Sequence, residues 1–141
     1  MQYERSVQIA AGTDVVWSVM SDVTSWPQWT ASIRSVQLLE PGPLAVGSRV
    51  RIQQPKLPTA VWEVTELEPG RGFTWTNRGP GMTSTGGHRI VSTTDGTSSV
   101  TLRIEQVGPG ALLAWLFLPL TRRYVQMEAA GLKSRCEQVT G

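Results

Sequence analysis

Residues 59–78 read TAVWEVTELEPGRGFTWTNR, and apolar and polar side chains alternate in them on both sides of a turn. The alternating apolar residues are Trp62, Val64, Phe73 and Trp75. Alternation with a period of two puts one set of side chains on each face of a strand, and Pro69-Gly70 is typical of a turn. The stretch therefore predicts two antiparallel strands, with one face against a core and the other in water.

The same alternation continues from Ile33 to Val107, interrupted by turns that contain glycine and proline. Asp95-Gly96 is the strongest hairpin signal among those turns. An earlier alternating stretch, Tyr3 to Ile9, predicts a first strand. Together these patterns predict strands at about 3–9, 33–39, 48–54, 59–68, 72–78, 83–92 and 98–107.

Helical spacing occurs near both ends of the chain. Asp14 to Met20 predicts a short helix, and Asp22 can cap a second short turn. The segment from about 111 to 138 predicts a long C-terminal helix, because apolar residues recur there at steps of three and four. Pro119 lies inside this segment, so we expect the helix to kink or to start twice there. Gly131 is expected to let the helix backbone approach the sheet.

The order of these elements predicts an α+β fold: a strand, two short helices, six strands and a long helix. A seven-stranded antiparallel sheet with one apolar face must be covered, and only the C-terminal helix is long enough to cover it. A curved sheet wrapped around a single helix leaves room for a cavity. Residues 1–141 are expected to form one domain, since the length suits a single core and 40% of the residues are hydrophobic.

The composition argues against several classes of function. The net charge is +2, and the arginines are scattered with no cluster longer than Arg122-Arg123, so we expect no nucleic-acid partner. A single cysteine, Cys136, excludes an internal disulfide, and a single histidine excludes a multi-histidine metal site. No glycine-rich phosphate-binding motif is present, so we expect neither a metal nor a cofactor.

The longest apolar run, Ala111 to Leu120, is half of the length that a membrane span needs, and it contains Pro119. We therefore expect no stable membrane insertion. The N-terminal residues lack the apolar core of a signal peptide, which favours a cytoplasmic protein. A helix that is apolar on every side is buried or is exposed for a reason. Burial or a homodimer contact is favoured for this run, and a pocket mouth or a transient membrane contact stays open.

Several short motifs follow one another in a fixed order along the chain. They are Val7-Gln8-Ile9-Ala10-Ala11 with Val15-Val16-Trp17, Asp22 with Trp26-Pro27-Gln28-Trp29, Gly47-Ser48-Arg49-Val50, Trp62 to Gly70 with Phe73-Thr74-Trp75, and Gly131-Leu132-Lys133 near Glu137. With this ordered set the sequence resembles the START-like (helix-grip, SRPBCC) superfamily, and more closely its polyketide cyclase/dehydrase-like branch.

The resemblance covers essentially the whole chain and implies the helix-grip fold, a curved seven-stranded sheet wrapped around the long C-terminal helix. It implies no single activity, because members include lipid carriers, hormone sensors and aromatic polyketide cyclases. The sequence offers no motif onto which the catalytic residues of the cyclases can be placed, so none is carried over.

Inward-facing residues are the candidates for the wall of a pocket. The expected ligand-binding set is Trp26, Trp29, Val50, Ile52, Trp62, Phe73, Trp75, Asn77, His88, Leu116, Leu120, Tyr124 and Met127. Large aromatic side chains at inward strand positions either stack on a planar ligand or pack as core, and both alternatives stay open for Trp62 and Trp75. A structural role is favoured for Trp26 and Trp29, which flank a proline.

Polar residues at inward positions are the candidates for chemistry. His88 and Tyr124 are the candidate catalytic residues, since an imidazole can act as a general acid or base and a phenol can donate a hydrogen bond. A core histidine bonded to the backbone and ordinary helix packing are the favoured readings of these two positions. Asn77 and Gln54 are candidate polar anchors of a pocket, because a buried amide needs a partner.

The leading hypothesis is the binding of a small hydrophobic or aromatic metabolite, lipid-like or polyketide-like, in a cavity between the sheet and the C-terminal helix. The first alternative is a polyketide cyclase or dehydratase acting in the same cavity, and the second is a protein-interaction or stress module with a vestigial cavity. A purely apolar lining would favour a carrier. A cavity in which His88 bonds a second titratable group would favour an enzyme, and a filled interior would favour the interaction module.

Overall fold

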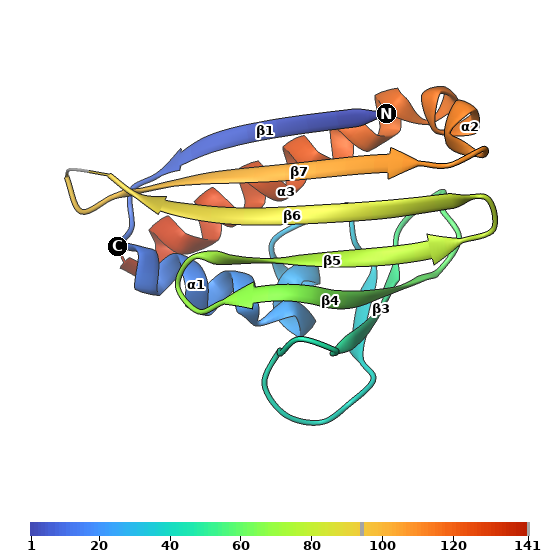
Figure 1. Ribbon diagram of the computed structural model, residues 1–141. Helices are drawn as coiled ribbons and strands as arrows, with labels where there is room; N and C mark the ends of the chain where they lie inside the picture. The colour runs from blue at the N-terminus through green and yellow to red at the C-terminus, as the bar shows by residue number, and fades with distance from the viewer. Residues whose placement is uncertain (94, 141) are drawn as a thin grey trace.

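The computed structural model describes residues 1–93 and 95–140, which form a curved sheet, short helices and a long C-terminal helix (Figure 1). The strands are β1 (Gln2–Ile9), β2 (Ser35–Leu38), β3 (Arg49–Gln53), β4 (Ala60–Glu68), β5 (Gly72–Gly79), β6 (Met82–Ser92) and β7 (Ser98–Val107). The helices are α1 (Thr13–Ser21), the 3₁₀ helix η1 (Val23–Gln28), α2 (Ala111–Leu116) and α3 (Leu118–Thr140).

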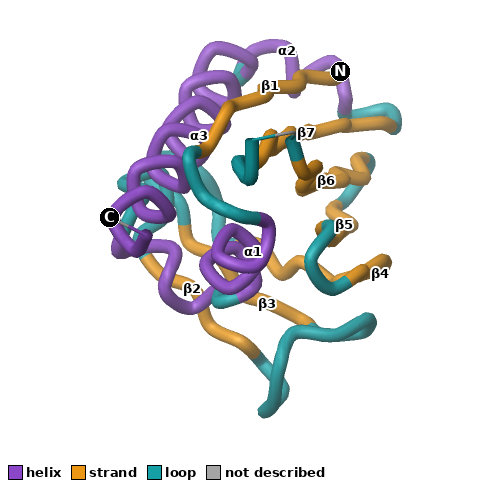
Figure 2. Tube along the Cα trace, turned by 90° about the vertical axis from the view of Figure 1, so that its left-hand side faces the viewer, coloured by secondary structure: helices purple, strands orange, loops and turns teal. Residues whose placement is uncertain are grey.

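The seven strands of the described chain join one antiparallel sheet in the order β1-β7-β6-β5-β4-β3-β2. β4 carries a bulge between Val64 and Glu66, and a bulge increases the local twist and bends the strand. In Figure 2 the sheet curls from β1 through β4 to β2, and α3 lies across the opening of the curve. This arrangement confirms the predicted α+β fold and its helix-grip form.

The expected strands are all present, with ends that differ by a few residues. The hairpin predicted at Asp95-Gly96 joins β6 to β7, which pair up to Ser92 opposite Ser98. Gly96 has φ +71°, a conformation that glycine adopts without strain. Thr94, in the same connection, lies outside the described residues.

The expected short turn after Asp22 is the 3₁₀ helix η1, which continues through Trp26 and Pro27. Asp22 precedes η1, and its carboxylate accepts a hydrogen bond from the Ser25 hydroxyl at 2.6 Å. The short stiff helix holds Trp26 inward, where its indole Nε1 donates to the Met20 carbonyl at 3.0 Å.

The C-terminal helix starts twice, as Pro119 predicted. α2 ends at Leu116 and α3 begins at Leu118, so the proline occupies the first turn of α3. A proline is tolerated there, because a first-turn N–H has no partner within its own helix. The break at Phe117 interrupts the helical phase between α2 and α3.

Gly131 does allow a close approach, although not to the sheet. A Cβ atom at this position would lie 2.0 Å from the backbone oxygen of Trp29, just after η1. The expectation that the glycine faces the sheet is therefore wrong. The close contact holds α3 against η1 and fixes the distance between the helix and the inner face of the sheet.

The inner face of the sheet, α1, η1 and the second half of α3 enclose the core. Its most completely buried apolar members include Ile9, Val16, Met20, Trp26, Val50, Val64, Val100 and Leu132. Among residues 1–93 and 95–140, no helix has both the length and the hydropathy that crossing a membrane requires.

Candidate functional site

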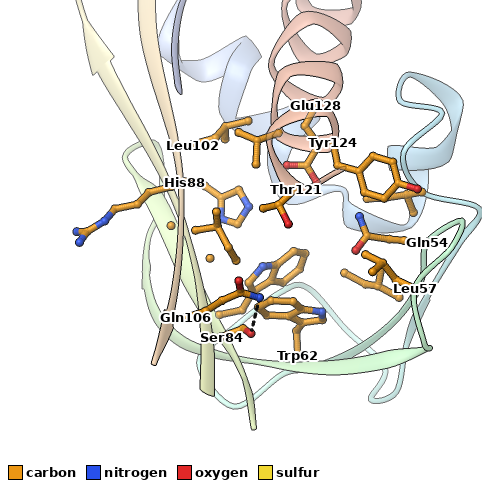
Figure 3. Close-up of a pocket in the computed structure, with 18 residues that line it drawn as sticks. Gln54, Leu57, Trp62, Ser84, His88, Leu102, Gln106, Thr121, Tyr124 and Glu128 are labelled. Atoms are coloured by element: carbon orange, nitrogen blue, oxygen red, sulfur yellow. Dashed lines mark hydrogen bonds between the residues drawn. The ribbon is translucent and has the colours of Figure 1, made fainter. Parts of the chain in front are cut away.

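A cavity of ≈140 Å³ lies between the inner face of the sheet and the first half of α3 (Figure 3). It is lined by Ile33, Ile52, Gln54, Leu57, Trp62, Trp75, Ser84, Gly86, Gly87, His88, Leu102, Arg103, Ile104, Gln106, Thr121, Tyr124, Val125 and Glu128. Eight of these residues are apolar, seven are polar or charged, and the remaining three are Gly86, Gly87 and Tyr124. Apolar and aromatic surface combined with placed polar groups is typical of a small-molecule site.

Two tryptophans on neighbouring strands form the aromatic wall. The ring centroids of Trp62 on β4 and Trp75 on β5 lie 6.0 Å apart, at a tilt of 39°. Gly86 on β6 makes room for this wall, since a Cβ there would lie 2.8 Å from the Trp75 Nε1. These two indole surfaces are suited to a planar apolar molecule.

His88 is buried on β6 and packed between aromatic rings. Its imidazole stacks on Phe73 with centroids 4.2 Å apart, and Trp75 meets it edge-on at 5.2 Å. Burial in these surroundings disfavours the charged form and lowers the pKa of His88 to about 4, against a smaller opposing effect of its bond to Phe73. The imidazole is therefore neutral at pH 7.

The tautomer of His88 follows from its hydrogen bond. Nδ1 lies 3.1 Å from the backbone oxygen of Phe73, and because a carbonyl only accepts, Nδ1 carries the proton. Nε2 is then left with its lone pair, and no described residue donates to it. A neutral imidazole with an unoccupied Nε2 can accept a hydrogen bond or a proton from a molecule in the cavity.

Glu128 brings a carboxyl group to the same cavity from α3. Residues at steps of three and four share one face of a helix, and here that face carries Thr121, Tyr124, Val125 and Glu128. Burial raises the pKa of Glu128 from 4.5 to about 7. Within the described chain no hydrogen bond or ion pair reaches its carboxyl, so at neutral pH it is present in both protonated and ionised forms.

Figure 3 shows the side chains of His88, Thr121 and Glu128 directed toward the same space. The pKa of Glu128, about 7, lies above the pKa of His88, about 4, which is the reverse of the usual order for a carboxyl and an imidazole. At pH 7 the imidazole is therefore neutral and the carboxyl is partly protonated. Together they offer one acceptor and one donor to an oxygen-bearing ligand. The same pair can also act as a base and an acid.

A second polar group lies at the β6–β7 side of the cavity. Gln106 donates from Nε2 to the Ser84 hydroxyl at 3.3 Å, as the dashed line in Figure 3 shows. The Oε1 of Gln106 is buried and has no partner among the described residues. A buried acceptor without a partner is unfavourable, so this oxygen is suited to a donor on a ligand or to an ordered water.

Tyr124 closes one side of the cavity. Its hydroxyl donates to the backbone oxygen of Pro55, in the connection between β3 and β4. This bond ties α3 to a loop that also places Gln54 and Leu57 on the lining. The phenol is therefore occupied as a donor, and the aromatic ring is what Tyr124 contributes to the cavity.

Part of the ligand-binding set expected from the sequence does line the cavity. Its members there are Ile52, Trp62, Trp75, His88 and Tyr124, and the candidate anchor Gln54 is also on the lining. His88 was expected to be a core histidine that is hydrogen-bonded to the backbone, and it does make that bond, to the Phe73 oxygen. It also lines the cavity. It is not bonded to a second titratable group; instead Glu128 shares the cavity with it.

Four expected residues belong to the core outside this cavity. Val50 is fully buried, and Phe73 lies behind His88 in the aromatic cluster. Trp26 packs against Phe73, Trp75 and His88, while Trp29 adjoins a separate void of ≈10 Å³ that His88 and Glu128 also line. These four side chains pack in the core and are not part of the cavity lining, so their role in ligand binding stays a prediction.

The other four expected residues lie away from the cavity for different reasons. Asn77, near the end of β5, donates its amide to the backbone oxygen of Val61 at 2.8 Å. Leu116 lies on α2, outside the lining and largely exposed. Leu120 and Met127 are half-buried on α3 but off the face that carries Glu128. The expected apolar repeat crosses the break at Phe117, where the helical phase is not continuous.

Glu128 is the functional candidate that sequence reasoning missed. It is the only acidic residue between Glu105 and Glu137 in the sequence, and it lies four residues after Tyr124 and seven after Thr121. That isolation on one face of a helix was the signal that could have identified it. Thr121, Ser84 and Gln106 carried no comparable signal, because each is an ordinary polar residue near the end of an element.

A wider hollow of ≈720 Å³ lies on the outer face of the sheet. Charged residues of both signs line it, including Glu66, Glu68, Arg71, Arg89 and Arg103. Its polar and open lining lacks the apolar enclosure of the inner cavity. The inner cavity is therefore the candidate site.

The comparisons with solved structures agree with the fold. The aromatase/cyclase Zhui from Streptomyces sp. R1128 is 19% identical, with a TM-score of 0.82, and the match covers 100% of this chain and 96% of that one. A START superfamily protein from Mycobacterium smegmatis is 16% identical, with a TM-score of 0.77 and 98% of both chains covered. The di-domain ARO/CYC BexL from the BE-7585A biosynthetic pathway is 21% identical, with a TM-score of 0.76, and the chain covers 48% of it. At these identities the likeness shows the fold.

No curated protein matches the sequence. The model of the family described as polyketide cyclase / dehydrase and lipid transport matches residues 1–137. That family and this fold support the binding of a hydrophobic ligand in the cavity. The chain belongs to the polyketide cyclase/dehydrase and lipid transport family.

Proposed function

We propose that the chain binds a small molecule with an aromatic or apolar body and one or two oxygen groups in the cavity between the sheet and α3. The observation that carries this proposal is the pairing of a tryptophan wall with two unpartnered polar groups, Nε2 of His88 and the carboxyl of Glu128. The rings favour a planar apolar body. A hydroxyl on the ligand can donate to His88 Nε2, and a carbonyl can accept from protonated Glu128.

The volume limits what the cavity encloses. A dry apolar cavity of about 150 Å³ holds a benzene molecule, so ≈140 Å³ encloses about one aromatic ring. A larger metabolite would extend past Tyr124 and the connection between β3 and β4. Release of the Tyr124–Pro55 bond would widen this side, because that bond joins the loop to α3.

A second candidate function is the elimination of water from a β-hydroxy ketone, and the reversed pKa order of His88 and Glu128 favours it. Nε2 of His88 takes the proton from the carbon next to the carbonyl, and that electron pair forms the new C=C bond. The C–O bond breaks, and the leaving hydroxyl takes a proton from Glu128 and departs as water. Transfer of one proton from His88 to Glu128 restores both groups.

We further propose that residues 1–141 act as one ligand-binding domain in the cytoplasm, without a nucleic-acid partner. A chain with a single cysteine has no internal disulfide, as is usual in that compartment. Exposed arginines of the sheet pair with nearby carboxylates, as Arg49 does with Glu40 and Arg103 with Glu105. Pairing of this kind leaves less positive charge for a phosphate backbone.

Calorimetric titration with naphthol, which carries one hydroxyl on an aromatic body, tests binding. Thr121→Phe places a ring in the cavity and should abolish binding of naphthol. Ser134→Phe adds the same ring on an exposed part of α3 and serves as the control. Equal binding by both variants would place the ligand elsewhere and overturn the proposal.

An aromatic β-hydroxy ketone tests the second candidate. Elimination needs neutral His88 and protonated Glu128, so its rate should be greatest between pH values of about 4 and 7. Glu128→Gln should abolish turnover while naphthol still binds. Turnover that persists in that variant would remove Glu128 from the mechanism and leave the binding proposal standing.

A further inference from the structure

α2 and the residue after it carry a cluster of exposed apolar side chains, here called the α2 patch. Its members are Leu112, Leu113, Trp115, Leu116 and Phe117. Their exposed fractions run from 49% to 79%. Of the six residues of α2, all within the described chain, only Ala114 is buried.

The position of α2 explains why packing does not cover the patch. The helix extends for only about 9 Å and lies at one end of the sheet, beside the start of α3 (Figure 1). Backbone bonds hold it there: Gly110 donates to the Gly81 oxygen at 2.7 Å, and Thr121 donates to the Phe117 oxygen at 2.9 Å. With Ala114 as its buried contact, the helix turns its large side chains outward, which marks an interaction surface.

The charged residues nearest to the patch along the chain are arginines. Arg122 and Arg123 follow it by one turn of α3, and both are exposed. Arg78 lies just before the β5–β6 turn, whose Gly81 bonds to the start of α2. No aspartate or glutamate occurs between Glu105 and Glu128 in the sequence. An apolar helix containing tryptophan and flanked by arginines is suited to an anionic lipid surface.

We propose that the α2 patch docks on the surface of an anionic lipid membrane, with its apolar side chains among the acyl chains and Arg122 and Arg123 at the headgroups. The helix lies in the interface and does not cross it. Trp115 and Phe117 supply the aromatic side chains that favour this depth.

A second copy of the chain fits the patch less well. A stable dimer buries about 800 Å² on each partner, and a helix of one and a half turns offers only part of that area. Two-fold pairing would also bring the arginines of both copies together. A homodimer is therefore the outcome that would contradict the proposal.

The docked orientation brings the cavity close to the membrane. Thr121 lines the cavity, and its N–H bonds to the oxygen of Phe117, so the patch lies one helical turn from the lining. Transfer of an apolar molecule between membrane and cavity rests on the proposed function. Docking itself does not, since the patch is outside the cavity and binds lipid with or without a ligand.

Co-sedimentation with vesicles tests docking on the full chain without added ligand. Wild-type protein should bind vesicles of phosphatidylcholine mixed with phosphatidylserine, more weakly at high salt and more weakly to phosphatidylcholine alone. Leu113→Ser with Leu116→Ser should weaken binding by roughly tenfold or more, because both side chains leave the acyl region. Arg122→Gln with Arg123→Gln should remove the preference for phosphatidylserine.

The matched control is Val46→Ser with Val139→Ser, which removes exposed apolar side chains elsewhere. It should bind vesicles as the wild type does, and all variants should keep the melting temperature of the wild type. Absence of vesicle binding would overturn the proposal. So would a concentration-dependent dimer in analytical ultracentrifugation that Leu113→Ser with Leu116→Ser dissociates. Wild-type protein that binds vesicles but does not bind naphthol would contradict only the proposed function.

Discussion

Replacing Glu128 by glutamine should stabilise the protein at high pH and leave it unchanged at low pH. The folded chain holds the pKa of Glu128 at about 7, whereas an unfolded chain has its ordinary value of 4.5. The unfolded state therefore releases this proton first as the pH rises. The contribution of Glu128 to the free energy of unfolding is therefore fully present below pH 4.5 and is lost progressively as the pH rises through about 7.

The size of the effect follows from that difference. A rise from 4.5 to about 7 corresponds to at most about 3 to 4 kcal/mol, because one pKa unit is worth about 1.4 kcal/mol. Solvent at the rim of the cavity screens part of this, so we expect about 1 to 2 kcal/mol. For a domain of this length that raises Tm by roughly 3 to 8 °C. Glutamine keeps the shape of the protonated carboxyl and cannot ionise.

Thermal unfolding followed by circular dichroism measures this at a series of pH values. His88 titrates in the opposite sense, so the wild type alone shows both effects superimposed, and only the difference between wild type and Glu128→Gln isolates the carboxyl. Glu66→Gln, an exposed position on β4, is the matched control and should show no pH-dependent difference. A Glu128→Gln effect that is equal below pH 4.5 and above pH 7, or a Glu128 pKa near 4.5 by NMR, would contradict a raised pKa for this carboxyl in the folded protein.

Three further perturbations test other parts of the structure. Gly131→Ala puts a Cβ atom 2.0 Å from the Trp29 oxygen, so urea unfolding should show a loss of about 1 to 3 kcal/mol; an unchanged stability would mean that α3 and η1 are less tightly packed. Tyr124→Phe removes the hydrogen bond to the Pro55 oxygen, so the free energy of unfolding should fall by about 1 kcal/mol. Amide hydrogen exchange in the β3–β4 connection should become faster. Unaltered exchange would show that this bond does not hold the connection against α3. His88 has a folded pKa of about 4 against 6.5 unfolded, so its contribution is present above pH 6.5 and is lost as the pH falls through about 4. His88→Gln should abolish that acid-side loss in urea unfolding, and a loss of the same size in the variant would assign it to other groups.

The sheet could be predicted from the sequence because its pattern is local. Strand alternation has a period of two, so Trp62, Trp75 and His88 had to share the inner face once the turns were placed. The sequence signal for the second start of the C-terminal helix was equally local, because it depends on Pro119 alone.

The cavity wall on α3 could not be predicted in the same way. Phe117 breaks the helix, and the phase of α3 cannot be inherited from α2. The apolar repeat pointed to Leu116, Leu120 and Met127, whereas packing against β1 and α1 turns the face with Thr121 and Glu128 toward the cavity. Which helix face meets a sheet depends on contacts far apart in sequence.

The aromatic residues near η1 show a second limit. Trp26 and Trp29 looked alike in the sequence, on either side of one proline. Trp26 is fixed in the core by its bond to the Met20 oxygen, while Trp29 adjoins Gly131 with a buried Nε1 that has no described partner. Periodicity does not distinguish two such neighbours, since their roles depend on how closely α3 approaches.

The most direct test of the binding proposal is native mass spectrometry of the purified protein, followed by extraction and identification of whatever is bound. We expect an apolar or aromatic molecule at close to one per chain, absent from Thr121→Phe and retained by Ser134→Phe. Protein that carries no such molecule, and whose melting temperature does not change across a panel of lipids and aromatic polyketides, would contradict the binding proposal.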